Sequence, residues 1–131
     1  MAGHAPDPGA AAFALLRNAH AALDRARDAD DAGERFCVAH LSALRSAAVL
    51  LALRGRPATA RRRLVSVWVL LDKVAPEYAE WSAYFAAGAP IRAAVEAGAS
   101  SVLTQRIADD QLRSAGEFLA LVESSLGMLA A

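Results

Sequence analysis

Arginines gather near the middle of the chain, and guanidinium groups are well suited to phosphate contacts. Arg61, Arg62 and Arg63 are consecutive, and Arg54 and Arg56 lie close by. The segment contains glycine and proline and shows no clear periodicity, which predicts a loop. No aromatic side chain interleaves with the arginines, so the pattern indicates electrostatic contact with nucleic acid rather than base stacking. A solvated loop that complements a helix C-terminus, or that meets an acidic protein surface, is the alternative.

Other side chains that could catalyse a reaction or bind a metal are few and scattered. His4, His20, His40 and the single Cys37 show none of the ligand spacings of metal sites, so we predict no metal and no cofactor. A lone cysteine cannot form an internal disulfide and favours a reducing compartment. The N-terminal residues lack the basic stretch of a signal peptide, and the uncharged run of the central apolar segment is too short for a bilayer. We therefore predict a cytoplasmic protein.

Composition predicts one helical domain. The chain has 131 residues, with 14 basic and 14 acidic side chains, so no net charge drives it towards nucleic acid or membranes. Apolar residues make up 56% and aromatic residues only 6%, and alanine is abundant, which favours closely packed helices. We expect residues 1–8 to form a disordered tail and residues 9–131 a single domain.

Residues 33–54 predict a long central helix, because apolar side chains recur there every three or four positions. Asp31 is placed to cap its first turn, and Glu34 can complete a capping box. Gly55 can adopt the left-handed conformation that ends helices, and Pro57 prevents the helix from resuming. At about 1.5 Å per residue, such a helix spans the full width of a small domain.

The other elements are also predicted to be helical, since no stretch alternates with a period of two. The apolar stripe of the first helix includes Phe13 and Leu16, and the turn that follows is short, so the first two helices should form an antiparallel hairpin. The expected helices besides the central one cover residues 9–28, 66–74, 77–87, 91–97 and 104–129. The predicted fold is an all-α, up-and-down bundle of four main helices plus a short extra helix.

Two apolar features leave alternatives open. The last helix holds a regular seam at three-and-four spacing, which fits either the groove beside the central helix or a second copy of the chain in a homodimer. An aromatic group follows the arginine segment and could line a ligand pocket, although at helical spacing it is more typical of core packing. This group comprises Trp68, Tyr78, Trp81, Tyr84 and Phe85.

Several of these stretches together resemble HEPN domains, small helical bundles named for nucleotide binding in higher eukaryotes and prokaryotes. The central helix carries Arg35-Phe36, Ala39-His40-Leu41 and the run from Ala43 to Ala48. The resemblance extends to Ser66 to Leu71, to Val74-Ala75-Pro76-Glu77, and to Ala108 to Leu112 leading into Glu117 to Glu123. The pattern covers residues 10–127 and is similar to an actinobacterial subfamily of short stand-alone HEPN proteins. It implies a HEPN-like helical bundle.

Catalytically active HEPN proteins are RNases whose motif is an arginine, four to six residues and then a histidine, near the start of the last helix. In this family a homodimer forms the cleft. Here the last helix offers Arg106 and Arg113, but no histidine follows His40 anywhere in the chain. The resemblance therefore implies a fold of the family without its nuclease motif in the usual place.

Arg35 and His40 match the motif spacing on the central helix instead. If they acted, His40 would take the proton from a ribose 2′-hydroxyl and Arg35 would stabilise charge on the phosphate, without a metal. An offset of five residues separates the two side chains by roughly 140° around a helix, so they do not simply converge. A packing histidine and a helix-surface arginine paired with Asp31 form the structural alternative.

The first functional hypothesis is a dimeric, non-catalytic HEPN module that binds RNA, a nucleotide or a protein partner. Some HEPN proteins pair with small nucleotidyltransferases in toxin and antitoxin systems, so the resemblance implies such a partner. The second hypothesis is a metal-independent RNase that uses Arg35 and His40. The third is a purely structural helical scaffold.

Overall fold

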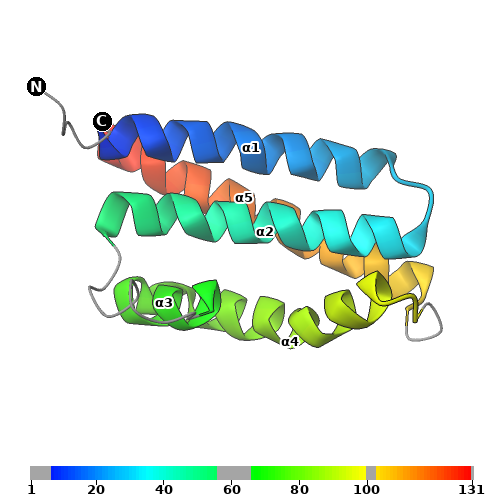
Figure 1. Cartoon of the computed structure of the whole chain (residues 1–131). Coiled ribbons are helices and arrows are strands. Elements are labelled where there is room, and N and C mark those ends of the chain that lie inside the picture. The colour runs from blue at the N-terminus through cyan, green and yellow to red at the C-terminus, as the bar shows by residue number, and fades with distance from the viewer. Residues whose placement is uncertain (1–6, 56–65, 100–102, 131) are drawn as a thin grey trace, which may run out of the picture.

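The computed structural model describes residues 7–55, 66–99 and 103–130. Helices α1 (Pro8–Asp28) and α2 (Ala32–Arg54) form an antiparallel hairpin. They are followed by α3 (Val67–Val74), a single 3-10 turn η2 (Pro76–Tyr78) and α4 (Ala79–Glu96), and α5 (Gln105–Ala130) is the last helix. In Figure 1, α2 lies between α1 and the α3–α4 layer, and α5 runs behind it. The predicted all-α, up-and-down bundle is confirmed, and the described residues contain no strand.

The predicted ends of α2 are confirmed by their capping geometry. The Asp31 carboxylate accepts a hydrogen bond from the Glu34 backbone N–H at 2.9 Å. At the other end, Gly55 has a φ of 84°, and its N–H donates to the Leu51 carbonyl at 2.8 Å. Glycine adopts this left-handed conformation without the steric cost that a Cβ would bring. Helix α2 therefore starts and stops where the local sequence dictates.

Helix α4 corrects the sequence-based prediction. A break at Gly88 and Pro90 was expected to separate a helix over residues 77–87 from one over residues 91–97, yet α4 is continuous from Ala79 to Glu96. Proline removes one backbone donor inside a helix and crowds the preceding turn. Both halves of α4 nevertheless pack on the bundle: Phe85 and Gly88 are buried, and Val95 reaches the start of α2. The buried residues of α4 all precede Pro90, and Val95 after it contacts the start of α2, so contacts on both sides of Pro90 outweigh its local effect.

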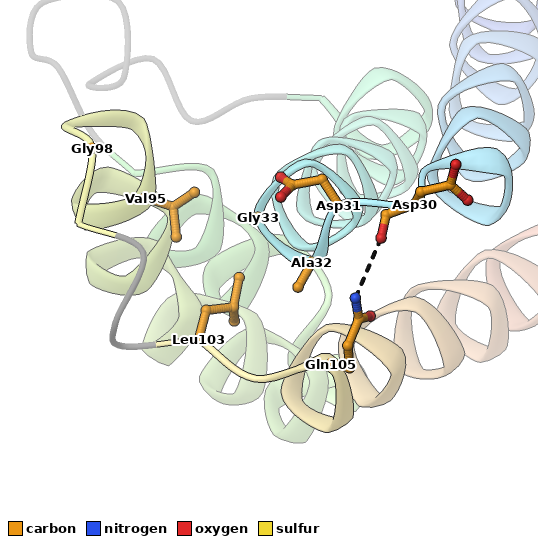
Figure 2. A pocket seen from close by; sticks show the side chains of 8 residues that line it. All are labelled: Asp30, Asp31, Ala32, Gly33, Val95, Gly98, Leu103 and Gln105. Atoms are coloured by element: carbon orange, nitrogen blue, oxygen red, sulfur yellow. Dashed lines mark hydrogen bonds between the residues drawn. The ribbon is translucent and has the colours of Figure 1, made fainter.

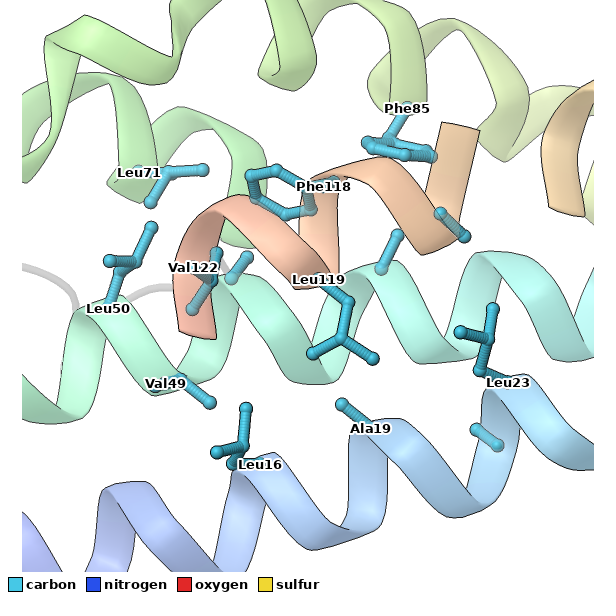
Figure 3. Packing of buried hydrophobic residues seen from close by; sticks show 14 of the residues in the cluster. Leu16, Ala19, Leu23, Val49, Leu50, Leu71, Phe85, Phe118, Leu119 and Val122 are labelled. Atoms are coloured by element: carbon cyan, nitrogen blue, oxygen red, sulfur yellow. The ribbon is translucent and has the colours of Figure 1, made fainter. Parts of the chain in front are cut away.

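The core lies where α1, α2, α3, α4 and α5 meet (Figure 3). The seam of α5 packs inside the chain: Ala115, Leu119 and Val122 are each at most 1% exposed. The sequence allowed this seam to pack either beside α2 or against a second copy of the chain. In the structure it packs beside α2, inside the bundle. Phe13, which the sequence placed on the apolar stripe of α1, is instead 51% exposed, while Leu16 is buried.

Most of the aromatic group belongs to this core. Phe118 has its ring centroid 5.5 Å from Phe85, 5.7 Å from Trp81 and 5.9 Å from Tyr78. Trp68 stacks on Phe85 at 5.3 Å. Such aromatic contacts stabilise a core beyond the area that they bury. The core interpretation is therefore right for these residues, and the exception, Tyr84, lines a surface pocket described below.

Helix α2 is long and apolar enough to cross a membrane by length and composition alone. In the most apolar stretch of 18 residues in α2, 61% is buried inside the bundle. It also contacts each of the other α-helices. A central core helix has these properties because it is covered by protein on nearly every side.

Candidate functional site

Arg35 lies at the junction of three helices. Its Nη2 donates to the Ala29 carbonyl at 2.6 Å, and its Nε donates to the Ala26 carbonyl at 3.2 Å. Its Nη1 donates to the Asp109 carboxylate at 2.7 Å. These carbonyls belong to the end of α1 and the turn after it; the Ala26 carbonyl also accepts from the Ala29 N–H at 3.3 Å, and Arg35 Nη2 donates to the Arg27 carbonyl at 3.5 Å. The guanidinium therefore ties this turn to α2 and to the first turns of α5.

His40 is buried on the opposite side of α2 from that junction, against α4. Only 3% of the residue is exposed, and its ring stacks on Phe36. Nε2 lies 3.0 Å from the Phe85 carbonyl, which can only accept, so Nε2 carries the proton and donates. Nδ1 then accepts from Arg92 Nη1 at 3.3 Å. Both ring nitrogens of a neutral imidazole are thus engaged.

Burial is the main reason why the pKa of His40 is lowered from its ordinary value. The hydrogen bond to the Phe85 carbonyl opposes this shift, the charge of Arg92 adds to it, and Glu96 opposes it. The imidazole therefore stays neutral near pH 7. Arg92 in turn lies 3.5 Å from Glu96, so its charge is balanced within α4.

The structure does not bring Arg35 and His40 to one cavity. The partners of Arg35 lie in α1, in the turn and in α5, whereas those of His40 lie in α4. Arg35 was expected to pair with Asp31; it pairs with Asp109 instead, because Asp31 caps its own helix. Catalysis by this pair remains an untested prediction.

Of the arginines proposed for nucleic-acid binding, only Arg54 lies in the described part of the chain. Its guanidinium makes a two-pronged contact with the Glu77 carboxylate at 3.0 and 2.6 Å, and it donates to the Val74 carbonyl at 3.2 Å. This hydrogen bond lowers the pKa of Glu77. Arg54 thus links the end of α2 to the η2 turn. Arg56 and Arg61 to Arg63 lie outside the described residues.

One pocket of about 410 Å³ lies at the end of the bundle where the α1–α2 turn, the end of α4 and the start of α5 meet. Figure 2 shows Val95 and Leu103 on one side, and Gln105 donating to the Asp30 carbonyl at 3.3 Å on the other. Asp31 lines it as well, but its carboxylate caps α2. Within the described residues, no three histidine, cysteine, aspartate or glutamate side chains are grouped to hold a metal.

A second pocket, of about 330 Å³, opens between α4 and α5, and we call it the α4–α5 pocket. Its lining is mainly apolar, and at its inner wall Gln111 is only 2% exposed. The Gln111 Nε2 has no hydrogen-bond partner in the described structure. The residues that define this pocket for the arguments below are Phe36, Tyr84, Gly88, Ile107, Asp110 and Gln111.

The thiol of Cys37 does not extend either pocket. It is half-buried on α2, and burial raises the pKa of this thiol, with Glu96 raising it further. A raised pKa keeps the sulfur protonated and therefore a poor nucleophile. A half-buried, protonated thiol packs as a small apolar side chain and fits this environment better than a reactive role.

The described residues thus form an all-α bundle in which a buried hydrogen bond from His40 to the Phe85 carbonyl joins α2 to α4. The model of the SAV_6107-like HEPN family matches residues 26–123, which is most of the chain. The chain belongs to this HEPN family. No curated protein and no solved structure matches it.

Gln111 is the residue that the sequence reasoning missed. It follows Arg106 after four intervening residues, on the helix and at the spacing where an active HEPN nuclease carries its histidine. An amide does not titrate near neutral pH and cannot take a proton from a hydroxyl. A search for the arginine spacing alone, without requiring histidine, would have found it. Gln111 is thus polar and buried but carries no group that could act as a base.

Proposed function

We propose that this HEPN domain is a non-catalytic binding module that works as a homodimer. The observation that carries the proposal is the engagement of Arg35 and His40 in internal hydrogen bonds. A base must reach the proton that it removes, and His40 is covered by protein on all sides. Gln111, at the usual position of the catalytic histidine, supplies no base either.

The RNase alternative would require a rearrangement of the core. Arg35 would have to leave three carbonyls and a carboxylate. His40 would have to leave Phe85 and Arg92 and reach the surface. Buried polar groups left without partners destabilise a fold by about 1–3 kcal/mol each. For this reason we rank catalysis below binding, and the purely structural scaffold remains the outcome if no partner is found.

The family resemblance favours another protein chain as the partner. Among the described residues, large apolar side chains that are at least a third exposed lie singly on four helices, which is ordinary for a protein surface. These residues are Phe13, Val69, Tyr84, Ile107 and Leu121. The family resemblance implies a second copy and a small nucleotidyltransferase as protein partners. RNA remains the alternative partner through the arginine segment.

The oligomeric state and RNA binding test this proposal together. Light scattering on the purified chain is expected to give twice the monomer mass, and a monomer at all concentrations would overturn the homodimer.

RNA binding is measured as a function of salt for the wild type and for Arg61→Ala/Arg62→Ala/Arg63→Ala. Each lost phosphate contact on single strands lowers the salt slope by about 0.7. An unchanged slope supports protein as the partner, and a reduced slope supports RNA. A matched control replaces Arg25 and Arg27 on α1.

A further inference from the structure

The buried imidazole of His40 joins the two halves of α4 across Pro90. Its Nε2 donates to the Phe85 carbonyl at 3.0 Å, before the proline, and its Nδ1 accepts from Arg92 Nη1 at 3.3 Å, after the proline. Proline has no N–H, so α4 lacks the backbone hydrogen bond that this position would donate to the Ala86 carbonyl. The imidazole thus spans the point where the helix is short of one of its own bonds.

The end of α4, residues 91–96, has few contacts with the bundle. None of these residues is buried, whereas three residues of α4 before the proline are. Arg92 bonds to His40, and Val95 lies against the start of α2, where a Cβ on Gly33 would be 2.9 Å from Val95 Cγ1. Segments with few buried contacts are those that open locally at a low cost in free energy.

The α4–α5 pocket leaves space beside the same joint. Gly88 and Ile91, which flank the proline, both line this pocket of about 330 Å³, so α4 is not closely packed on α5 there. On the α5 side, Gln111 Nε2 has no hydrogen-bond partner in the described structure. Moving the end of α4 therefore disrupts little of the close packing that holds a protein interior rigid.

Protonation of His40 removes the link to Arg92. A neutral imidazole donates at one nitrogen and accepts at the other, but the cation donates at both. The bond to the Phe85 carbonyl survives protonation, whereas Arg92 Nη1 would face a second positive charge at 3.3 Å. The imidazole cation therefore favours a state in which Arg92 has moved away and water accepts from Nδ1.

Among the described residues, only α4 brings charged groups to this imidazole. Arg92 and Glu96, which lie 3.5 Å apart, are both on α4. From α2 itself comes the uncharged thiol of Cys37, one turn away. The ring of Trp68 on α3 has its centroid 6.2 Å away, and α5 contributes the neutral amide of Gln111. A response to pH at this joint is thus a matter between the imidazole and the end of α4.

We propose that His40 is a proton-controlled latch on α4, whose protonation releases residues 91–96 from α2 and lets them swing about Pro90. Opening withdraws Val95 from the pocket at the end of the bundle, which Val95 lines together with the start of α2. The latch is closed at neutral pH and opens in acid. It acts within one chain, so it is independent of dimerisation and of RNA binding.

The direction of the pH dependence follows from the two states. In the closed state, burial and the charge of Arg92 hold the pKa of His40 below its ordinary value, which Glu96 opposes. In the open state the imidazole is hydrated and its pKa returns towards about 6.5. The equilibrium constant for opening therefore rises as the pH drops below about 6.5, at most about tenfold per pH unit. It levels off below the pKa of the closed state.

The experiment is amide hydrogen exchange of the ¹⁵N-labelled chain from about pH 7.5 to about pH 5, corrected for the intrinsic pH dependence of exchange. The N–H groups of residues 91–93 bond to carbonyls before the proline, so a swing breaks these bonds first. Protection of residues 91–96 is expected to fall in acid by up to about tenfold per pH unit. Low concentrations of urea should not change their exchange, because a local opening exposes little surface.

Two variants keep the hydrogen bond but remove the switch. The amide of His40→Gln can donate and accept but does not titrate, and the amide of Arg92→Gln can donate to the neutral imidazole or accept from its cation. Both are expected to keep residues 91–96 protected in acid. His20→Gln is the matched control, since His20 is an exposed histidine on α1 that pairs with Glu123 at 3.0 Å. It should respond to pH as the wild type does.

Any of three results refutes the latch. The first is that protection of residues 91–96 in the wild type does not change with pH. The second is that Arg92→Gln, whose side chain is partly exposed and outside the core, loses protection in acid as the wild type does. The third is that exchange of residues 91–96 in acid is as sensitive to urea as exchange in the middle of α2, which would mean unfolding of the whole chain.

Discussion

Replacing Arg35 with alanine is expected to lower the free energy of unfolding by about 3 kcal/mol while the helical architecture persists. The Arg35 side chain is 21% exposed, and its guanidinium donates hydrogen bonds of 3.2 and 2.6 Å to carbonyls at the end of α1 and in the following turn. Bonds between a charged donor and such carbonyls contribute about 1–1.5 kcal/mol each when the acceptors can be partly rehydrated. The ion pair with Asp109, whose carboxylate is 55% exposed, adds about 0.5 kcal/mol.

The assay is urea unfolding followed by circular dichroism, with Arg45→Ala as the matched control on the same helix. Arg45 makes a single exposed hydrogen bond, at 3.3 Å, to the Asn18 carbonyl, so its replacement should change stability by less than about 0.5 kcal/mol. Asp109→Asn separates the ion pair from the carbonyl contacts. If Arg35→Ala were as stable as Arg45→Ala, the reasoning would be refuted and Arg35 would be free for another role.

Three further changes test the core and its polar contacts. Because the pKa of His40 is lowered in the folded state, the unfolded chain protonates this histidine at a higher pH than the folded chain does. The free energy of unfolding should therefore fall as the pH drops below about 6.5, by at most about 1.4 kcal/mol per pH unit. It should level off below the pKa of the folded state. Denaturation across pH should show this loss in the wild type but not in His40→Gln, and parallel curves would contradict it. Phe118→Ala should lower the free energy of unfolding by about 3–5 kcal/mol, because the fully buried ring contacts four other aromatic rings. Leu121→Ala, at a position that is 45% exposed, should lower it by less than about 1 kcal/mol. Similar losses for the two variants in urea unfolding would show that the core is misplaced. A double-mutant cycle of Arg54→Ala and Glu77→Ala should give a coupling of about 0.5–1 kcal/mol that weakens in high salt, and a coupling of zero would mean that the contact is not held in solution.

Local signals account for what could be predicted of the fold. The capping aspartate and the terminal glycine of α2 act within one turn, and the Ser66 hydroxyl accepts from the Trp68 N–H at the start of α3 in the same way. The continuity of α4 could not be predicted, because the local effect of Pro90 opposes it. Only the packing of residues distant in sequence decides that case.

The candidate site was harder to predict for the same reason. Spacing placed Arg35 and His40 in one motif, but their partners lie 45 to 74 residues away along the chain at Phe85 and Asp109. A single helix cannot show that a histidine will be covered by a helix formed much later in the sequence. Gln111 was missed because an amide carries no catalytic signal.

The most direct test of the central claim is cleavage of a mixed RNA substrate by the purified chain in EDTA. A metal-independent RNase serves as the positive control, and His40→Gln and Arg35→Lys are assayed below their melting temperatures. If these two residues serve the fold, as their hydrogen bonds indicate, the wild type leaves the RNA intact. Cleavage by the wild type that disappears in both folded variants would contradict the account and make Arg35 and His40 an active site.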